Sequence, residues 1–286
     1  MNCMRFVLTI LIALPAFLSL SCKKGIETPV PVEDAFSIGE IGSIDVGDLG
    51  AAEISAFDPV TKRLFIVNNS TVNKIDVVDL SNPANPVYIQ SISLTAYGGY
   101  VNSLDIHDGK LAAAIEAIVK QDPGKVVVFD CNTYNEVKVI PVGALPDMIT
   151  YSPDGKYILT ANEGEPNDTY TNDPVGSVSI ITVPEYAVTT VDFSSFSSSL
   201  TTLRSQGFRV FGPGNNFARD IEPEYITVSA DSKTAWVTLQ ENNAIAQIDL
   251  NTKAAVKIMP LGYKHYGLNP YKMDLSDRDN TIAFNK

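Results

Sequence analysis

From residue 36 onward, the chain alternates short runs rich in Val and Ile with clusters of Pro, Gly, Asn and Asp. Runs of this length bounded by turn-forming residues are typical of β-strands. The third of these groups predicts strands over residues 147–151, 157–161, 177–183 and 187–193. Equivalent third strands are predicted at 74–80, 125–130 and 244–250.

The predicted strands belong to a repeat that is marked by a tight turn ending in lysine. The turn lysines are Lys62, Lys110, Lys156 and Lys233, which are 48, 46 and 77 residues apart. The longest spacing holds one period and an insertion, which we assign to residues 194–206 and the Gly-Pro loop after them. Four strands in every 45 or so residues are typical of a propeller blade.

We therefore predict an all-β fold, a β-propeller with about four four-stranded blades in an incomplete or open ring. The propeller domain covers residues 36–286, with blades at 50–95, 100–143, 146–195 and 222–262 and partial segments at both ends. Residues 36–46 are predicted to form a strand of the kind that seals a closed ring, and the blade it would join is missing. The chain is thus interpreted as a fragment or an early-terminated product. A sandwich or a generic meander is the alternative, which the repeated turn disfavours.

The N-terminus has the pattern of an export signal. Arg5 precedes an apolar run over residues 6–20, which is shorter than the roughly 20 residues needed to span a bilayer. Residues 19–22, Ser-Leu-Ser-Cys, resemble a bacterial lipobox. We predict a lipoprotein signal peptide over residues 1–21, lipidation of Cys22 and a flexible tether over residues 22–35. A plain secretory signal with an incidental cysteine is the alternative.

Composition narrows the class of function. The chain has 286 residues, 45% of them hydrophobic, and 21 Lys and Arg against 33 Asp and Glu give a net charge of −12. This acidic balance argues against a nucleic-acid partner. Three Cys and two His exclude a zinc cluster or a disulfide scaffold. We interpret His107 and His265 as surface residues and Cys131 as an inert core thiol. No dinucleotide fingerprint or nucleophile elbow occurs.

Acidic residues recur in register with the turn lysines. Glu53, Asp147 and Glu224 each stand nine residues before a turn lysine, where the first strand of a blade opens. Further acids follow the second strands, on the same predicted face. The predicted metal ligands are Glu53, Asp147, Glu163, Glu165, Glu222, Glu224 and Glu241. Such hard oxygen donors suit calcium. Solvated loop residues that keep the surface soluble are the alternative.

Several strings resemble those of the choice-of-anchor I domain family of secreted bacterial proteins. They include Gly98-Gly-Tyr-Val-Asn-Ser103, Ala161-Asn-Glu-Gly-Glu-Pro-Asn-Asp168, Glu222-Pro-Glu-Tyr-Ile226 and Leu239-Gln-Glu-Asn-Asn243. The similarity covers nearly all of residues 45–280. It implies a propeller related to a mesenchyme surface glycoprotein and, more distantly, to propeller alkaline phosphatases that use calcium. It assigns no catalytic residue.

The leading hypothesis is a cell-envelope lipoprotein, on the periplasmic or the surface side, that is held to the membrane by a lipid on Cys22. Its propeller would be a binding or scaffold domain with calcium or a cationic ligand on the acidic face. A calcium-dependent phosphoesterase on the same propeller is the alternative, but no nucleophile–base pair supports an enzyme. A structural module that recruits proteins without calcium is a third possibility.

The lipid anchor is testable by labelling. Cells fed a radiolabelled fatty acid are expected to label the wild-type chain and not Cys22→Ser, because the thiol is the acylated group. Cys3→Ser is the matched control and keeps the label, since Cys3 lies in the part that cleavage removes. An unlabelled wild type, or a labelled Cys22→Ser variant, would contradict the prediction.

Overall fold

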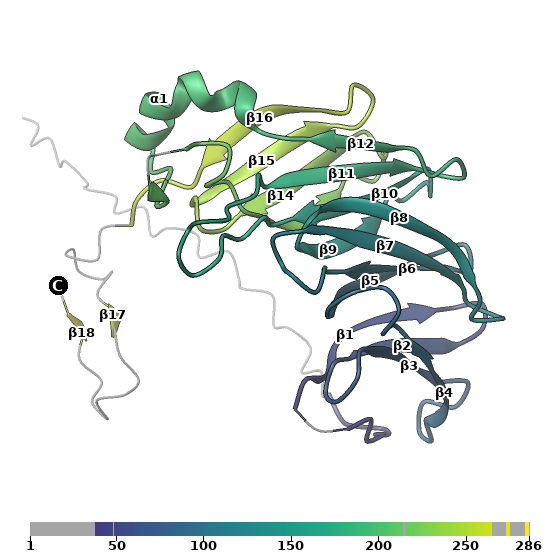
Figure 1. Cartoon of the computed structure of the whole chain (residues 1–286). Coiled ribbons are helices and arrows are strands. Elements are labelled where there is room, and N and C mark those ends of the chain that lie inside the picture. The colour runs from purple at the N-terminus through teal and green to yellow at the C-terminus, as the bar shows by residue number, and fades with distance from the viewer. Residues whose placement is uncertain (1–37, 48, 214–215, 265–272, 275–283, 286) are drawn as a thin grey trace, which may run out of the picture. The chain divides into compact units, whose positions relative to one another are not determined.

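Four antiparallel four-stranded sheets and one short two-stranded sheet are found in the described part of the chain (Figure 1). The computed structural model describes residues 38–47, 49–213, 216–264, 273–274 and 284–285. Backbone contacts divide the chain into residues 1–40 and 41–286, and the second unit contains the sheets. No helix in the described ranges has the length and apolar character needed to cross a membrane. The predicted signal peptide, Cys22 and the tether lie outside the described residues.

Each sheet is a meander of four strands that pair in chain order. The first contains β1 (Ala51–Asp58), β2 (Arg63–Asn68), β3 (Lys74–Asp79) and β4 (Val87–Ser93). The second contains β5 (Val101–His107), β6 (Lys110–Ile115), β7 (Pro123–Asp130) and β8 (Glu136–Ala144). The third contains β9 (Pro146–Tyr151), β10 (Tyr157–Asn162), β11 (Ser177–Thr182) and β12 (Val188–Val191). The fourth contains β13 (Pro223–Val228), β14 (Thr234–Leu239), β15 (Ala244–Asp249) and β16 (Ala254–Pro260).

The first strand of each sheet lies beside the first strand of the next. Contacts join β1 to β5, β5 to β9 and β9 to β13. Among the described residues, no comparable contact joins the first sheet to the fourth. The predicted all-β propeller architecture with four four-stranded blades is confirmed, and the sheets of the described residues form no closed ring.

Both faces of the middle strands of the second and third sheets are buried, because each of these two sheets packs between two others. Successive side chains of a strand point to opposite faces. In β7, Val127 therefore joins a core with the first sheet, whereas Val126 and Val128 join a core with the third sheet. A third core lies between the last two sheets and contains Leu159 and Val237. This double burial explains why the strands are near-continuous apolar runs and not alternating ones.

The repeated turn has the same internal hydrogen bonds in the third and fourth sheets. Ser152 Oγ accepts the amide of Tyr157 at 3.0 Å, and Ser229 Oγ accepts the amide of Thr234 at 3.0 Å. Each serine also donates to an aspartate two residues later, Asp154 or Asp231. These side chains satisfy backbone groups that the turn leaves without strand partners.

The insertion after the third sheet is helical, which the sequence prediction missed. A 3₁₀-helix (Ser194–Ser199) continues into α1 (Leu200–Ser205), and Leu203 is buried in the core between the last two sheets. Phe208 and Phe217 stack there with ring centroids 5.6 Å apart. The insertion thus adds apolar side chains to this core. Two short strands, β17 (Met273–Asp274) and β18 (Phe284–Asn285), pair near the end of the chain.

The predicted strand over residues 36–46 is wrong for the part described. Residues 38–47 form no strand and are largely exposed. Val46 contributes its carbonyl to the Asn68 side chain at 2.8 Å, which ties this segment to the end of β2. A strand requires a neighbouring strand to hydrogen-bond its backbone, and the described sheets offer this segment none.

Burial in the core between the third and fourth sheets predicts how substitutions change the free energy of unfolding. Leu159→Ala removes a side chain with 0% exposure and is expected to lower the free energy of unfolding by about 2–5 kcal/mol. Val256→Ala, at a position 49% exposed, should lower it by less than about 0.5 kcal/mol. Urea unfolding followed by Trp236 fluorescence measures both. Equal losses would contradict the assigned packing.

Candidate functional site

The first strand of each sheet, which we call the inner strand, starts at the same end of the fold in all four sheets. The register pairs Ala51 with Asn68, Val101 with Ile115, Pro146 with Asn162, and Pro223 with Leu239. The start of each first strand is thus next to the end of the second strand and the loop that follows it. This geometry brings together the two sets of acidic positions that recur in the sequence.

A break in the ladder occurs near the start of every first strand. The register shifts around Asn102 in β5, around Asp147 in β9 and around Glu224 in β13. In β1 the irregular segment between Ala51 and Ser55 includes Glu53. A bulge leaves a residue out of the ladder and re-aims its side chain. Each strand opener is therefore freed from regular pairing.

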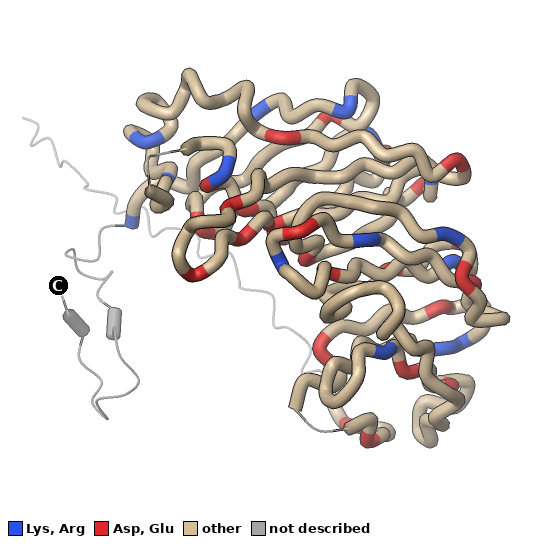
Figure 2. The backbone as a smooth tube through the Cα atoms, viewed as in Figure 1, with Lys and Arg blue, Asp and Glu red and all other residues tan. Residues whose placement is uncertain are grey.

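The six predicted acids of the third and fourth sheets form one electrostatic cluster, which we call the acidic cluster. Its members are Asp147, Glu163, Glu165, Glu222, Glu224 and Glu241, each of which raises the pKa of another member or has its own pKa raised by one. Figure 2 shows acidic positions gathered where these two sheets begin. The structure brings these six residues near one another, and their role as metal ligands stays a prediction.

Burial and mutual repulsion hold protons on this cluster. Burial raises the pKa of Glu163 to about 8, with further increases from Asp147 and Glu165. Burial likewise raises the pKa of Glu222 to about 7, and the adjacent charge of Glu241 adds to the shift. For Asp147, burial raises the pKa while Lys120 opposes the increase. Several of these acids are therefore partly protonated at neutral pH.

Glu224 and Glu241 are joined by a side-chain hydrogen bond. Burial raises the pKa of Glu224, and a hydrogen bond with Glu241 raises it further. Such a pair retains one proton, because ionising both carboxyl groups would place two like charges side by side. The second oxygen of Glu241, Oε2, is buried and has no hydrogen-bond partner among the described residues. A buried, unpartnered carboxylate oxygen is a costly group that a cation would stabilise.

Asparagine side chains position the loops that carry the cluster. The Asn242 amide donates to the carbonyls of Asp220 at 2.6 Å and Arg209 at 3.1 Å, and its oxygen accepts the amide of Glu222 at 3.3 Å. Asn242 is fully buried. Sequence reasoning did not assign it a role, although it lies in the string Leu239–Asn243. Asp220, which also acts on Glu222, was missed as well.

Glu165 is at the edge of the cluster. Its carboxylate lies 3.8 Å from Lys120, and both side chains are about half exposed. An ion pair this exposed and this long contributes little stability. Glu165 and Asp168 line an open hollow of about 520 Å³ together with Lys120. The hollow is therefore lined by charges of both signs.

Glu53 differs from the other predicted ligands. It is exposed and lines a separate hollow of about 260 Å³ with Asn69, Tyr100 and Asn102. Asn69 bridges to the backbone of Val101 in the next sheet, which leaves amides and not carboxylates around Glu53. Glu53 thus lies apart from the acidic cluster of the third and fourth sheets.

The acids do not form a ready-made ion site. Within the described residues, no three His, Cys, Asp or Glu side chains are placed so that they could hold one metal ion. Calcium takes six to eight oxygens around one point. As it stands, the cluster fits positive charge distributed over several groups better than a single bare ion.

The comparison with protein families agrees with the fold. Residues 53–286 match the family model of the choice-of-anchor I domain. Kuenenia stuttgartiensis hydrazine synthase is similar in structure at 15% identity, with a TM-score of 0.43, over 73% of this chain and 75% of that chain. The β-propeller domain of Myceliophteria thermophila Cps50 (Swd1) is similar at 11% identity, with a TM-score of 0.49, over 74% of this chain and 55% of that chain. The comparison with curated proteins gives no match.

The raised carboxyl pKa values predict how stability changes with pH. Glu163 and Glu222 titrate above their unfolded values, so the folded chain binds more protons than the unfolded chain between about pH 4.5 and pH 8. Stability from these groups is present at low pH and is lost as pH rises through this window. The melting temperature is therefore expected to fall from pH 5.5 to pH 8.5.

The variant Glu163→Gln is expected to flatten that decline, because it replaces a group that takes up a proton with one that does not titrate. Glu185→Gln, in the turn between β11 and β12, is the matched control and should leave the slope unchanged. Melting temperatures at several pH values measure both. An unchanged slope in Glu163→Gln would show that this carboxyl titrates normally.

Proposed function

Because the chain belongs to the choice-of-anchor I domain family, we propose that it is a cell-envelope binding protein whose acidic cluster holds a cationic ligand. Domains of this family are typically parts of exported bacterial proteins. The observation that carries the proposal is the gathering of six carboxyl groups from two sheets. The propeller is the scaffold that brings them together.

A cation would replace the protons that now reduce repulsion within the cluster. Glu163 and Glu222 have raised pKa values because their charged forms lack a counter-charge in a partly buried site. The ligand must therefore compete with protons, and its affinity must increase with pH. The unpartnered Oε2 of Glu241 would be the most strongly stabilised oxygen.

The spacing of the acids favours a ligand with several positive groups, such as a polyamine or a basic peptide segment. Calcium is the second candidate, and the buried Glu241 oxygen is the observation in its favour. Calcium binding would require the side chains to converge from their present positions. In this proposal a lipid on Cys22 attaches the chain to the membrane and would hold the domain on the periplasmic or the surface side.

Calorimetric titration of the full chain with spermidine and with calcium chloride tests the proposal. At least one of them is expected to bind, and more tightly at pH 8.5 than at pH 6.0. Glu163→Gln should weaken binding about fivefold, corresponding to roughly 1 kcal/mol. Glu53→Gln is the matched control, since this exposed acid lies in a separate hollow, and it should bind like the wild type.

Failure of both cations to bind at pH 8.5 would contradict the proposal. Equal weakening by Glu163→Gln and Glu53→Gln would do so too, because it would indicate nonspecific attraction to an acidic surface. Calcium-stimulated hydrolysis of an aryl phosphate that is lost in Glu163→Gln would instead support the phosphoesterase alternative.

A further inference from the structure

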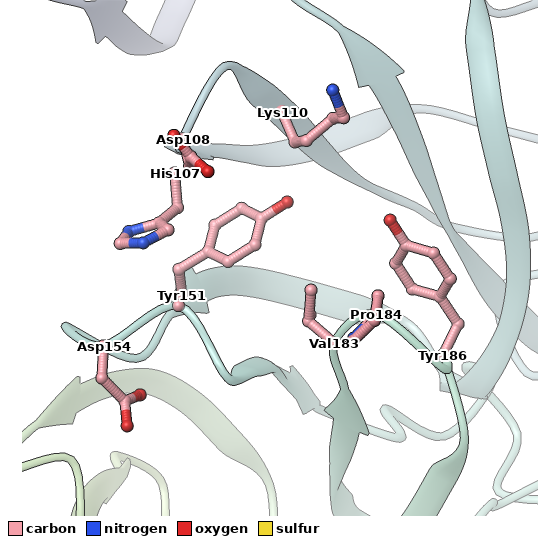
Figure 3. A pocket seen from close by; sticks show the side chains of 9 residues that line it. His107, Asp108, Lys110, Tyr151, Asp154, Val183, Pro184 and Tyr186 are labelled. Atoms are coloured by element: carbon pink, nitrogen blue, oxygen red, sulfur yellow. The ribbon is translucent and has the colours of Figure 1, made fainter.

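A separate pocket of about 320 Å³ lies between the second and third sheets (Figure 3). It is formed by turns at the opposite end of these strands from the acidic cluster. Three turns supply its lining: the β5–β6 turn with His107 and Asp108, the β9–β10 turn beyond Tyr151, and the β11–β12 turn with Tyr186. This volume is near the lower end of the range of about 300–1,000 Å³ typical of small-molecule sites.

Aromatic rings form the walls of this pocket. Figure 3 shows Tyr151 and Tyr186 on opposite sides with their hydroxyl groups turned toward the same space. The His107 ring lies beside Tyr151, with centroids 5.6 Å apart and planes tilted by 32°. The imidazole of His107 lies against the turn at Gly155. A Cβ at this position would lie 2.3 Å from His107 Nε2 and would clash with the ring, so glycine makes the contact possible. His107, interpreted from sequence as a surface residue, is thus half-buried in a built pocket.

The equivalent grooves on either side are closed by a cation of the chain itself. Between the first and second sheets, the Arg63 guanidinium lies 5.0 Å from the ring centroid of Tyr134. Between the third and fourth sheets, the Lys253 ammonium lies 5.8 Å from the ring centroid of Tyr157. Tyr134, Tyr186 and Lys253 occupy the same left-handed turn position in their sheets, with φ of 60°, 57° and 51°.

The middle groove has two tyrosine rings, and its lysine, Lys110, is paired with Asp130 and does not lie over either ring. Leu111 stands where the first groove has Arg63 and the third has Tyr157, and its side chain is fully buried in the core. Within the described residues, no cation lies over Tyr151 or Tyr186. In this groove both tyrosines line a pocket.

The charges around the pocket favour a cation over an anion. Lys110 lines the pocket, but its ammonium is paired with Asp130 at 2.9 Å. Asp154 is paired with Lys156, also at 2.9 Å. Asp108 is exposed and makes no ion pair within the part of the chain that is described. The remaining unpaired charge of the lining is therefore a carboxylate.

We propose that this pocket binds the ammonium group of a small soluble amine. The group would lie against the faces of Tyr151 and Tyr186 as Arg63 lies over Tyr134, with Asp108 as counter-charge. Aromatic walls attract cations through the negative face of the ring, and such cages recognise methylated ammonium groups. This site is independent of the acidic cluster.

Ligand-observed NMR and calorimetric titration of the full chain with choline test the proposal. Choline is expected to bind, and its uncharged isostere 3,3-dimethyl-1-butanol is expected to bind about tenfold more weakly or not at all. Tyr186→Ala should weaken choline binding about tenfold by removing one wall. Tyr88→Ala, at an exposed tyrosine of β4, is the matched control and should bind like the wild type.

Asp108→Asn is a second variant that preserves the fold, because asparagine suits the left-handed φ of 46° before Gly109. It should weaken choline binding several-fold while leaving the melting temperature unchanged. No choline binding at about 10 mM, equal binding of the isostere, or binding of inorganic phosphate in place of choline would overturn the proposal. Binding to phosphatidylethanolamine vesicles without binding to free ethanolamine would overturn the assignment of a soluble ligand.

Discussion

The rest of the structure depends on the packing of each sheet against its neighbours, which buries both faces of the second and third sheets. A β-sheet with apolar residues on both faces cannot be stable alone, so the sheets must stack side by side. Val126, Val127 and Val128 illustrate this, since alternate residues of one strand join different cores. Stacking aligns the inner strands, and their starts therefore meet at one end of the fold.

That alignment places the ionisable groups of the acidic cluster in a partly buried position, which disfavours their charged forms. The inner strands bring Asp147 and Glu224 close to Glu163 and Glu241, where partial burial and like charges disfavour ionisation. The bulges free the strand openers from regular pairing, and Asn242 holds the loop of Glu222 in place. These acids destabilise the fold at high pH, and a positively charged ligand at this position would reduce the repulsion among them. This combination of cost and position is typical of binding sites.

The parts of the fold that depend on local pattern were predictable from sequence. Val- and Ile-rich runs and the recurring turn lysine gave the four blades and the convergence of six acids. The parts that depend on distant partners were not. Residues 38–47 have strand-like composition but no strand beside them, and the serine-rich insertion is helical with Leu203 and two phenylalanines buried in a core. Glu53 occupies the equivalent register position, yet its neighbours are amides. The bulges arise from strand pairing, and the pocket lined by Tyr151 and Tyr186 arises from the packing of two sheets. Neither is visible in a linear pattern.

The most direct test of the account is the titration of individual carboxyl groups by carbon-detected NMR on glutamate-labelled protein. The convergence of acids at the third and fourth sheets predicts that Glu163 titrates near pH 8 and Glu222 near pH 7. Assignment by the variants Glu163→Gln and Glu222→Gln identifies each signal. If all glutamates titrate near the ordinary value of about 4.3, the carboxyl groups are neither buried nor gathered, and the central claim fails.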